Sequence, residues 1–214
     1  GIRRSRLQHL PFLLFDDCYM ANIETAYELN RVTDYLIGCP TEIMGHGMPY
    51  RQMWKFLSPT KPDYKSVVDA FYTFYSNYAI GQNKYHYGTI SVTDCSKVDA
   101  MMNVLSSIHR KYKIGTAVSS DLQVLDGYVP EAFFDFGDYI RRLCSRDAEL
   151  TKKFDAALTE LVPYETHTEY YFSSLTNAGE HQIKTCSGLT ISAPSTNTMV
   201  VKSKPKSHFY ALFR

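Results

Sequence analysis

The chain has 214 residues, and 23 Lys and Arg residues nearly balance 22 Asp and Glu residues, which leaves a formal net charge of +1. This balance excludes the strong electrostatic field that draws proteins to nucleic acid or to anionic membranes. Hydrophobic residues make up 44% of the chain, which suits one α/β domain that buries its core without disulfides or metals. No run approaches the roughly 18 apolar residues of a transmembrane helix. We expect neither a nucleic-acid partner nor a membrane partner.

The first 40 residues predict a strand, a helix and a second strand. Residues 10–15 read LPFLLF, an apolar run typical of a strand buried on both faces of a parallel sheet. Residues 20–32 have helical spacing of apolar side chains, and 35–38 form a second short apolar run. The three segments predict a right-handed βαβ unit in an α/β fold with a mostly parallel central sheet flanked by helices.

The rest of the chain continues the α/β pattern. Residues 41–62, which include GHGMPY at 45–50, are rich in Gly, Pro and Met and predict a long loop that walls a pocket. Ser96 and Asp99 resemble a capping box that opens a helix to about residue 112. Further helices are expected at 66–80, 138–144 and 148–161, and further strands at 88–93, 167–173 and 189–193.

Cys18 follows the first strand and precedes the first helix, the place where open α/β sheets put catalytic groups. A helix that starts near Tyr19 would favour the thiolate through its dipole, while Asp16 and Asp17 would oppose it by charge repulsion. A carboxylate beside a nucleophile can receive the cationic end of a Lys or Arg substrate, and Asp16 is the candidate for that task. The alternative is a buried, inert cysteine beside aspartates that cap the helix.

Two segments carry a family resemblance: FDDCYMANIETAYEL at 15–29 and DYLIGCPTEIMGHGMPY at 34–50. Together they resemble the clostripain family of cysteine peptidases. The text at 89–102, FFDFGDYI at 133–140 and GLTIS at 188–192 is similar to the same family in the same order. The resemblance covers most of the chain, and it is tightest over the first 50 residues.

The resemblance implies a caspase-like three-layer sandwich and a Cys and His dyad that hydrolyses peptide bonds after Arg or Lys. Residues 1–214 would form the heavy-chain part of one peptidase domain, or the region from about 145 would form a C-terminal subdomain. Cys18 would be the nucleophile, backbone amides would hold the oxyanion, and substrates would be proteins or peptides with Arg or Lys. Relatives are bacterial and exported, so we expect a secreted or cell-envelope location.

The catalytic histidine is expected on another polypeptide. In the family it precedes the cysteine on an upstream strand, whereas His9 is the only histidine before Cys18 in this chain. His9 begins the strand that Cys18 ends, roughly 30 Å away at about 3.3 Å per residue, so it cannot be the base. We therefore expect a light chain, separated by self-cleavage, that carries the first strands and the histidine. The basic stretch of Arg3, Arg4 and Arg6 fits such a cleavage site, and it equally fits a solvated basic turn.

Three further residues are expected to shape the pocket. Asp17 stands where the family has a small residue such as Ala, and His46 stands where relatives carry Asp or Asn that shapes the pocket for a basic side chain. His46 has an alternative role as the catalytic base, because its loop could fold over Cys18. Glu42 is either a pocket-wall residue that contacts the substrate or a carboxylate that anchors the loop.

No cofactor is required by the sequence. The histidines lack ligand spacing, and no DxDxDG-type loop supports the calcium with which clostripain itself is associated. The main alternative function is a catalytically inactive caspase-like protein that binds or regulates others. A nucleic-acid-binding module would rest only on scattered cations: Arg3, Arg4, Arg6, Lys202, Lys204 and Lys206.

Overall fold

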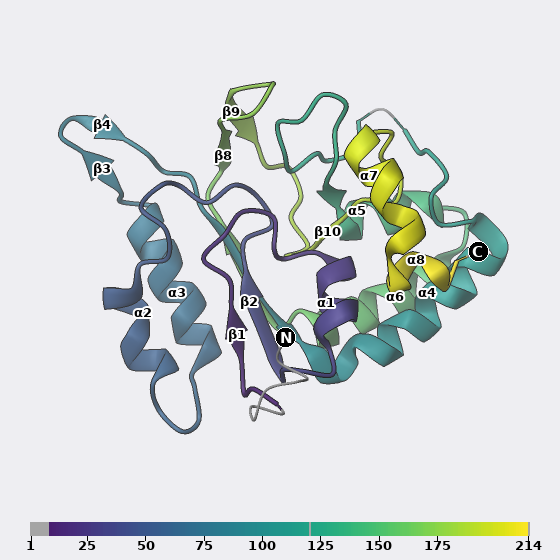
Figure 1. The fold of residues 1–214 in the computed structure, drawn as a ribbon, viewed down its shortest axis with the longest axis horizontal. Helices are drawn as coiled ribbons and strands as arrows, with labels where there is room; N and C mark the ends of the chain where they lie inside the picture. Colours follow the sequence, from purple (N-terminus) through teal and green to yellow (C-terminus); the bar gives the residue numbers. More distant parts are fainter. Residues whose placement is uncertain (1–8, 120, 214) are drawn as a thin grey trace.

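The structure, a computed structural model, describes residues 9–119 and 121–213 and places helices on both faces of a central sheet (Figure 1). The helices are α1 (Ile23–Leu29), α2 (Tyr50–Leu57), α3 (Tyr64–Tyr75), η2 (Cys95–Lys97), α4 (Val98–Tyr112), α5 (Phe136–Leu143), α6 (Ala148–Leu161), α7 (Thr198–Ser203), η3 (Lys204–Lys206) and α8 (His208–Ala211). The strands are β1 (Leu13–Leu14), β2 (Tyr35–Gly38), β3 (Ala79–Ile80), β4 (Asn83–Lys84), β5 (Thr89–Asp94), β6 (Phe134–Asp135), β7 (Tyr164–His167), β8 (Tyr170–Ser173), β9 (Gly179–Gln182) and β10 (Thr190–Ile191).

The βαβ unit at the start of the chain is confirmed. β1 and β2 are parallel, with Leu13 opposite Leu36, and α1 connects them. β2 has the predicted bounds, whereas the helix begins at Ile23 rather than at residue 20. Asn22 sets this start, because its side-chain oxygen accepts a hydrogen bond from the Thr25 N–H at 2.7 Å and so caps the helix.

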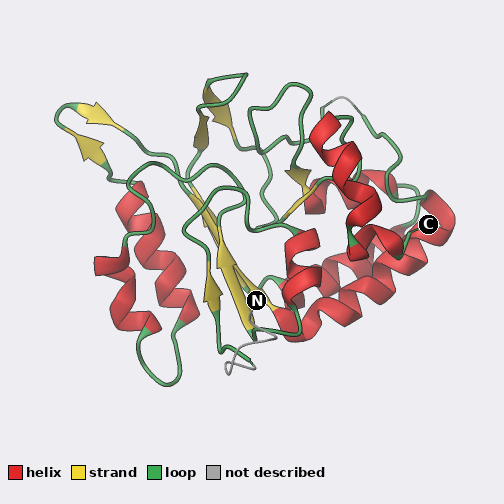
Figure 2. Cartoon of the chain, viewed as in Figure 1, coloured by secondary structure: helices red, strands yellow, loops and turns green. Residues whose placement is uncertain are grey.

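The central sheet is mixed, so the prediction of a mostly parallel sheet is not confirmed. Its order is β1-β2-β5-β7, and only the pair β1–β2 is parallel; β2–β5 and β5–β7 are antiparallel. The reason lies in the connections. The chain leaves β2, forms α2 and α3 on one face, and re-enters the sheet as β5 in the opposite direction (Figure 2). The apolar run of a strand reports its burial and not its direction.

Two hydrophobic clusters pack on opposite faces of the sheet. Alternate residues of β2 supply both: Leu36 packs with α4 and α6, whereas Ile37 packs with α2 and α3. This alternation is the ordinary consequence of strand geometry, in which successive side chains point to opposite faces. The arrangement gives three layers, with α2 and α3 on one side and α1, α4 and α6 on the other (Figure 1).

The prediction of a loop throughout 41–62 is wrong for its second half, where α2 forms. Met53 and Leu57 are buried, four residues apart on one face of the helix. They pack in the same cluster as Phe71 of α3. Pro49 stands at the N-cap, where its missing N–H costs no helical hydrogen bond.

The C-terminal helix α8 packs against α1, the helix that follows Cys18. The Tyr210 hydroxyl donates a 2.5 Å hydrogen bond to the Glu24 carboxylate, and the His208 N–H donates a 2.9 Å bond to Glu28. The last helix of the described chain thereby supports the short helix that follows Cys18.

Gly88→Ala is expected to destabilise the chain by about 2 kcal/mol, because an added methyl group overpacks the core. A Cβ at position 88 would lie 2.8 Å from Tyr75 and 2.9 Å from Phe71, both of which are fully buried. Urea unfolding measures the change in the free energy of unfolding. Gly45→Ala is the matched control, since nothing lies within 4 Å of its added Cβ. Equal stability of the two variants would contradict the packing described here.

Candidate active site around Cys18

Cys18 lies in a turn between β1 and α1, as the sequence predicts. The segment runs beside β2 and the residues after it: the Phe15 N–H donates to Ile37, and the Tyr19 N–H donates to Thr41. Because α1 begins only at Ile23, its dipole does not start directly after the cysteine, and that part of the prediction is wrong. Cys18 is partly exposed and not disulfide-bonded.

Tyr19 holds the turn in an unusual backbone conformation. Its φ is +61°, in the left-handed region that non-glycine residues rarely adopt and that costs on the order of 1 kcal/mol. The ring stacks on Phe133 at a centroid distance of 5.0 Å, which offsets the cost. Sequence reasoning missed this residue, since aromatic side chains carry no signal for positive φ.

The Asp16 carboxylate is fastened to the loop 45–50. Its Oδ1 accepts a 2.8 Å hydrogen bond from the Met48 N–H. Gly47, at φ +74°, passes so close that a Cβ there would lie 2.8 Å from the same oxygen. The pKa of the Tyr50 hydroxyl is raised, first by burial and then by its hydrogen bond to Asp16. Asp16 thus presents a fixed carboxylate two residues from the thiol, although the residue remains exposed.

The Glu42 carboxylate anchors a second loop beside the site. Its two oxygens accept hydrogen bonds from the N–H and the hydroxyl of Ser174, at 2.8 and 2.6 Å. These bonds are the contact that the loop-anchoring alternative predicts, and contact of Glu42 with a substrate stays a prediction. Glu42 is also near enough to Cys18 for its charge to act on the thiol.

His46 packs against α3. Its ring stacks on Phe74 at 4.8 Å and lies 5.2 Å from Tyr78. Within the described residues it forms no hydrogen bond to Cys18, so the geometry lends nothing to the alternative in which His46 is the base. His9, which its distance along the strand excludes as the base, contacts Asp34 through Nε2 at 2.8 Å.

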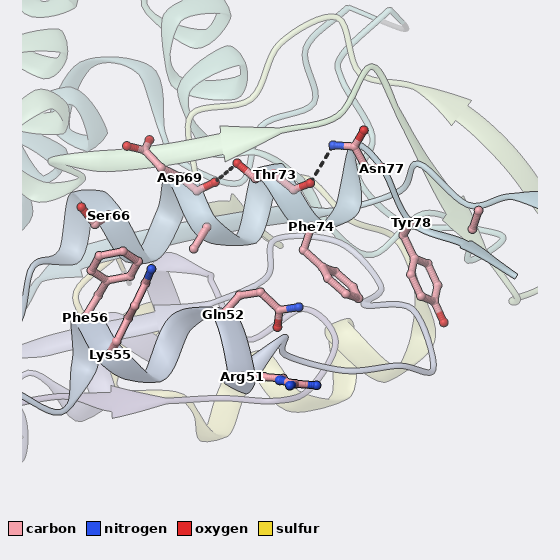
Figure 3. Close-up of a pocket in the computed structure, with 12 residues that line it drawn as sticks. Arg51, Gln52, Lys55, Phe56, Ser66, Asp69, Thr73, Phe74, Asn77 and Tyr78 are labelled. Atoms are coloured by element: carbon pink, nitrogen blue, oxygen red, sulfur yellow. Dashed lines mark hydrogen bonds between the residues drawn. The ribbon is translucent and has the colours of Figure 1, made fainter.

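A large groove lies apart from these residues. It has a volume of about 930 Å³ and runs between α2 and α3, with Phe56 and Phe74 among its apolar lining and Arg51 and Lys55 on α2 (Figure 3). None of the predicted site residues lines it. The candidate active site is at Cys18, because peptide hydrolysis by a thiol requires a cysteine, and none of the described residues that line the groove between α2 and α3 is a cysteine.

The described part of the chain contains no group of three or more His, Cys, Asp or Glu side chains placed to hold a metal ion. Within the same residues, no helix combines the length and the apolar character needed to cross a membrane. The predicted cleavage site at Arg3, Arg4 and Arg6 lies outside the described residues.

Alkylation of Cys18 in this chain is expected to speed up as pH rises, with a midpoint above the ordinary thiol pKa of 9.0. Burial raises the pKa of the Cys18 thiol most, the Ile43 N–H lowers it, and the charges of Glu42 and Asp17 raise it further. All three raising effects disfavour the thiolate, which is the reactive form. Rates of iodoacetamide labelling, resolved by peptide mass spectrometry, measure the midpoint.

Glu42→Gln is expected to lower that midpoint, because the amide keeps an oxygen for Ser174 but carries no charge. Glu149→Gln is the matched control, an exposed carboxylate paired with Lys153 on α6. A midpoint that stays unchanged in Glu42→Gln would contradict the placement of this charge.

The chain is similar to a known protein family and to several solved structures. The model of the clostripain family matches residues 4–211. Among solved structures, a clostripain from Bacteroides thetaiotaomicron ATCC 29148 in complex with the peptide inhibitor BTN-VLTK-AOMK is similar at 42% identity and a TM-score of 0.86. That alignment covers 96% of this chain and 87% of the other. A comparison with curated proteins finds no match.

Two longer structures are similar as well. A secreted cysteine protease from Bacteroides thetaiotaomicron, iotapain, has 42% identity and a TM-score of 0.86, with 96% of this chain and 56% of that chain covered. An inactive zymogen protease from Parabacteroides distasonis has 26% identity and a TM-score of 0.82, with 96% and 59% covered. This chain therefore spans somewhat more than half the length of these two relatives.

Proposed function

Because the chain belongs to the clostripain family, a family of cysteine proteases, we propose that it is a cysteine endopeptidase that cleaves after Lys or Arg. The observation that carries this proposal is the fixed carboxylate of Asp16 two residues from the partly exposed thiol of Cys18. A carboxylate whose orientation is set by the Met48 amide can pair with a substrate cation without first being ordered.

In the proposed reaction the Cys18 thiolate attacks the carbonyl carbon after the basic residue. The carbon–nitrogen bond breaks, the leaving amine takes a proton from the histidine, and water then hydrolyses the thioester. One similar structure binds a peptide inhibitor whose sequence, VLTK, ends in lysine, which supports a basic residue at this position.

The histidine would come from a light chain of the same precursor, matured by self-cleavage. The edge of the sheet supports this partner: β1 pairs with β2 on one side only, within the described residues. A strand with an unpaired edge is a ready site for pairing with another strand. Such a strand would complete a caspase-like sheet. The similarity to an inactive zymogen supports maturation by cleavage, and the similarity to a secreted protease supports export from a bacterial cell.

A catalytically inactive binding or regulatory protein is the second candidate. The observation that favours it is the raised pKa of the Cys18 thiol, since burial and two carboxylates keep the thiol protonated near neutral pH. A histidine cation from the light chain would act in the opposite sense and restore the thiolate.

Reporter peptides that differ only in the residue before the cleaved bond test the proposed specificity. The complete gene product, carrying both chains, is assayed with Lys, Arg and norleucine at this position; norleucine is nearly as long as lysine but neutral. We expect Lys and Arg reporters to be cleaved on the order of 100-fold faster, the scale of one desolvated charge pair. Equal rates would remove the charge-reading role, and no cleavage of any reporter would support the inactive candidate.

A further inference from the structure

The backbone N–H of Cys18 is bound by a side chain rather than by the sheet. Its acceptor is Oδ1 of Asp17, at 2.8 Å. On either side, the N–H groups of Phe15 and Tyr19 are bonded to carbonyl oxygens of β2 and the residues after it. Within the described part of the chain, no backbone carbonyl accepts from the Cys18 amide, whose acceptor is this side chain alone.

A donor of this kind has a known use beside a nucleophile. In acyl transfer by serine peptidases, the backbone N–H of the nucleophilic residue helps to hold the oxygen on which negative charge develops. The same placement in this chain would put the Cys18 amide next to the oxygen of an attacked carbonyl. Asp17 fills this place with an oxygen that already carries negative charge.

The occupant is held loosely. Asp17 is exposed, and within the described residues the bond to Cys18 is the sole hydrogen bond of its carboxylate. Rotation about its side-chain bonds would move the carboxylate into water at the cost of one hydrogen bond, about 1 kcal/mol. By contrast, Asp16 is fixed by the Met48 amide, so the two neighbouring aspartates differ in freedom.

We propose that the Asp17 carboxylate is a displaceable occupant of the oxyanion site. The carbonyl oxygen of a substrate must replace this carboxylate at the Cys18 N–H before Cys18 can attack. This inference rests on the proposed function, since it assigns a role at the same thiol. The ligand class that competes with Asp17 is a tetrahedral oxyanion formed on Cys18. Separately from this occupancy, the charge of Asp17 raises the pKa of the Cys18 thiol.

The variants Asp17→Ala and Asp17→Asn separate occupancy from charge. Asparagine removes the charge but keeps an oxygen that can accept from the Cys18 N–H, whereas alanine removes both. Two probes are applied to the complete gene product. Iodoacetamide reports the thiolate alone, because displacement at its saturated carbon creates no oxyanion. A peptide aldehyde ending in lysine reports the oxyanion site. Its carbon bonds to the Cys18 sulfur, and the carbonyl electron pair moves to the oxygen that the amide would hold.

We expect Asp17→Ala and Asp17→Asn to react with iodoacetamide at similar rates, both faster than the unaltered protein at pH 7. The aldehyde is expected to bind Asp17→Ala about tenfold tighter than Asp17→Asn, because only alanine frees the donor. Equal aldehyde affinity of the two variants overturns the inference. Thermal melting of each variant checks folding, and Asp17→Gly serves as a second variant without an acceptor if alanine lowers stability.

Failure of this inference and failure of the proposed function give different results. If the proposed function fails, the unaltered protein cleaves no lysyl reporter and shows no saturable binding of the aldehyde. If only the inference fails, the unaltered protein cleaves the reporter normally while alanine and asparagine at position 17 behave alike towards the aldehyde.

Discussion

Cys18→Ala is expected to lower hydrolysis of lysyl and arginyl reporters by about 10⁴- to 10⁶-fold, the scale seen when a peptidase loses its nucleophile. Methyl cannot form the thioester, so what remains is catalysis by binding and electrostatics alone. The structural cost is small, because the side chain is partly exposed and lies in a turn outside both main hydrophobic clusters. Initial rates at saturating reporter, measured on the complete gene product, give the change in kcat.

The same variant addresses maturation. If the chain is released by its own activity, the Cys18→Ala precursor is expected to keep its full mass, whereas the unaltered precursor splits. Cys186→Ala is the control, a second cysteine without a disulfide that lies far from the turn in sequence and packs against the cluster of Leu125, Tyr171 and Ile183. Cleavage of reporters by Cys18→Ala at the unaltered rate would falsify the assignment of the nucleophile.

Asp16→Asn is expected to lower kcat/KM for the lysyl reporter on the order of 100-fold and to leave the norleucyl reporter nearly unchanged. The amide retains an oxygen for the Met48 N–H, so the loop 45–50 keeps its anchor, but the charge that would pair with the substrate cation is gone. The loss is expected chiefly in KM if the charge pair forms equally in the bound substrate and in the transition state.

Asp69→Asn is the matched control for Asp16→Asn. Its carboxylate lies on α3, is paired with Lys65 and lines the large groove away from Cys18. We expect this variant to keep the reporter kinetics of the unaltered protein. An equal loss of kcat/KM for lysyl and norleucyl reporters in Asp16→Asn would show that Asp16 supports the loop and does not pair with the substrate cation.

Local sequence patterns were sufficient to predict the bounds of elements that have one regular buried face. β2 and α6 have the bounds that their apolar runs predict, because each is buried along a regular face. The strand expected at 167–173 is instead divided, with β7 ending at His167 and β8 beginning at Tyr170. Thr168 makes the break: its hydroxyl bonds to the Gly88 carbonyl, a contact with a distant strand that no local pattern contains.

The helix expected to open on a capping box shows a similar limit. Asp94, and not Ser96, is the residue whose side chain caps this region, since its carboxylate accepts from the Ser96 N–H and hydroxyl. The 3₁₀ turn η2 therefore precedes α4, and Asp99 pairs with Arg31 of another segment. Ser-x-x-Asp marks a helix start only where the chain has not already been capped upstream.

For the candidate site, the order of residues in the sequence was sufficient to place Cys18 after a strand. The contacts between separate loops could not be predicted from that order. The bond between Asp16 and Met48 spans 32 positions, and the bonds between Glu42 and Ser174 span 132. Such contacts depend on how separate loops pack, which residue spacing does not encode. The packing of His46 on Phe74 belongs to the same class.

The contact between α8 and α1 has a consequence for the order of events during synthesis. Glu24 and Tyr210 lie 186 positions apart, and Glu28 and His208 lie 180 apart, so α1 gains this support only after residues 208–210 have been synthesised. Contacts between residues so far apart in sequence slow folding, although the loop-closure entropy itself rises only slowly with loop length. A ribosome-bound fragment that ends before His208 would therefore carry the Cys18 thiol without the contacts that support α1.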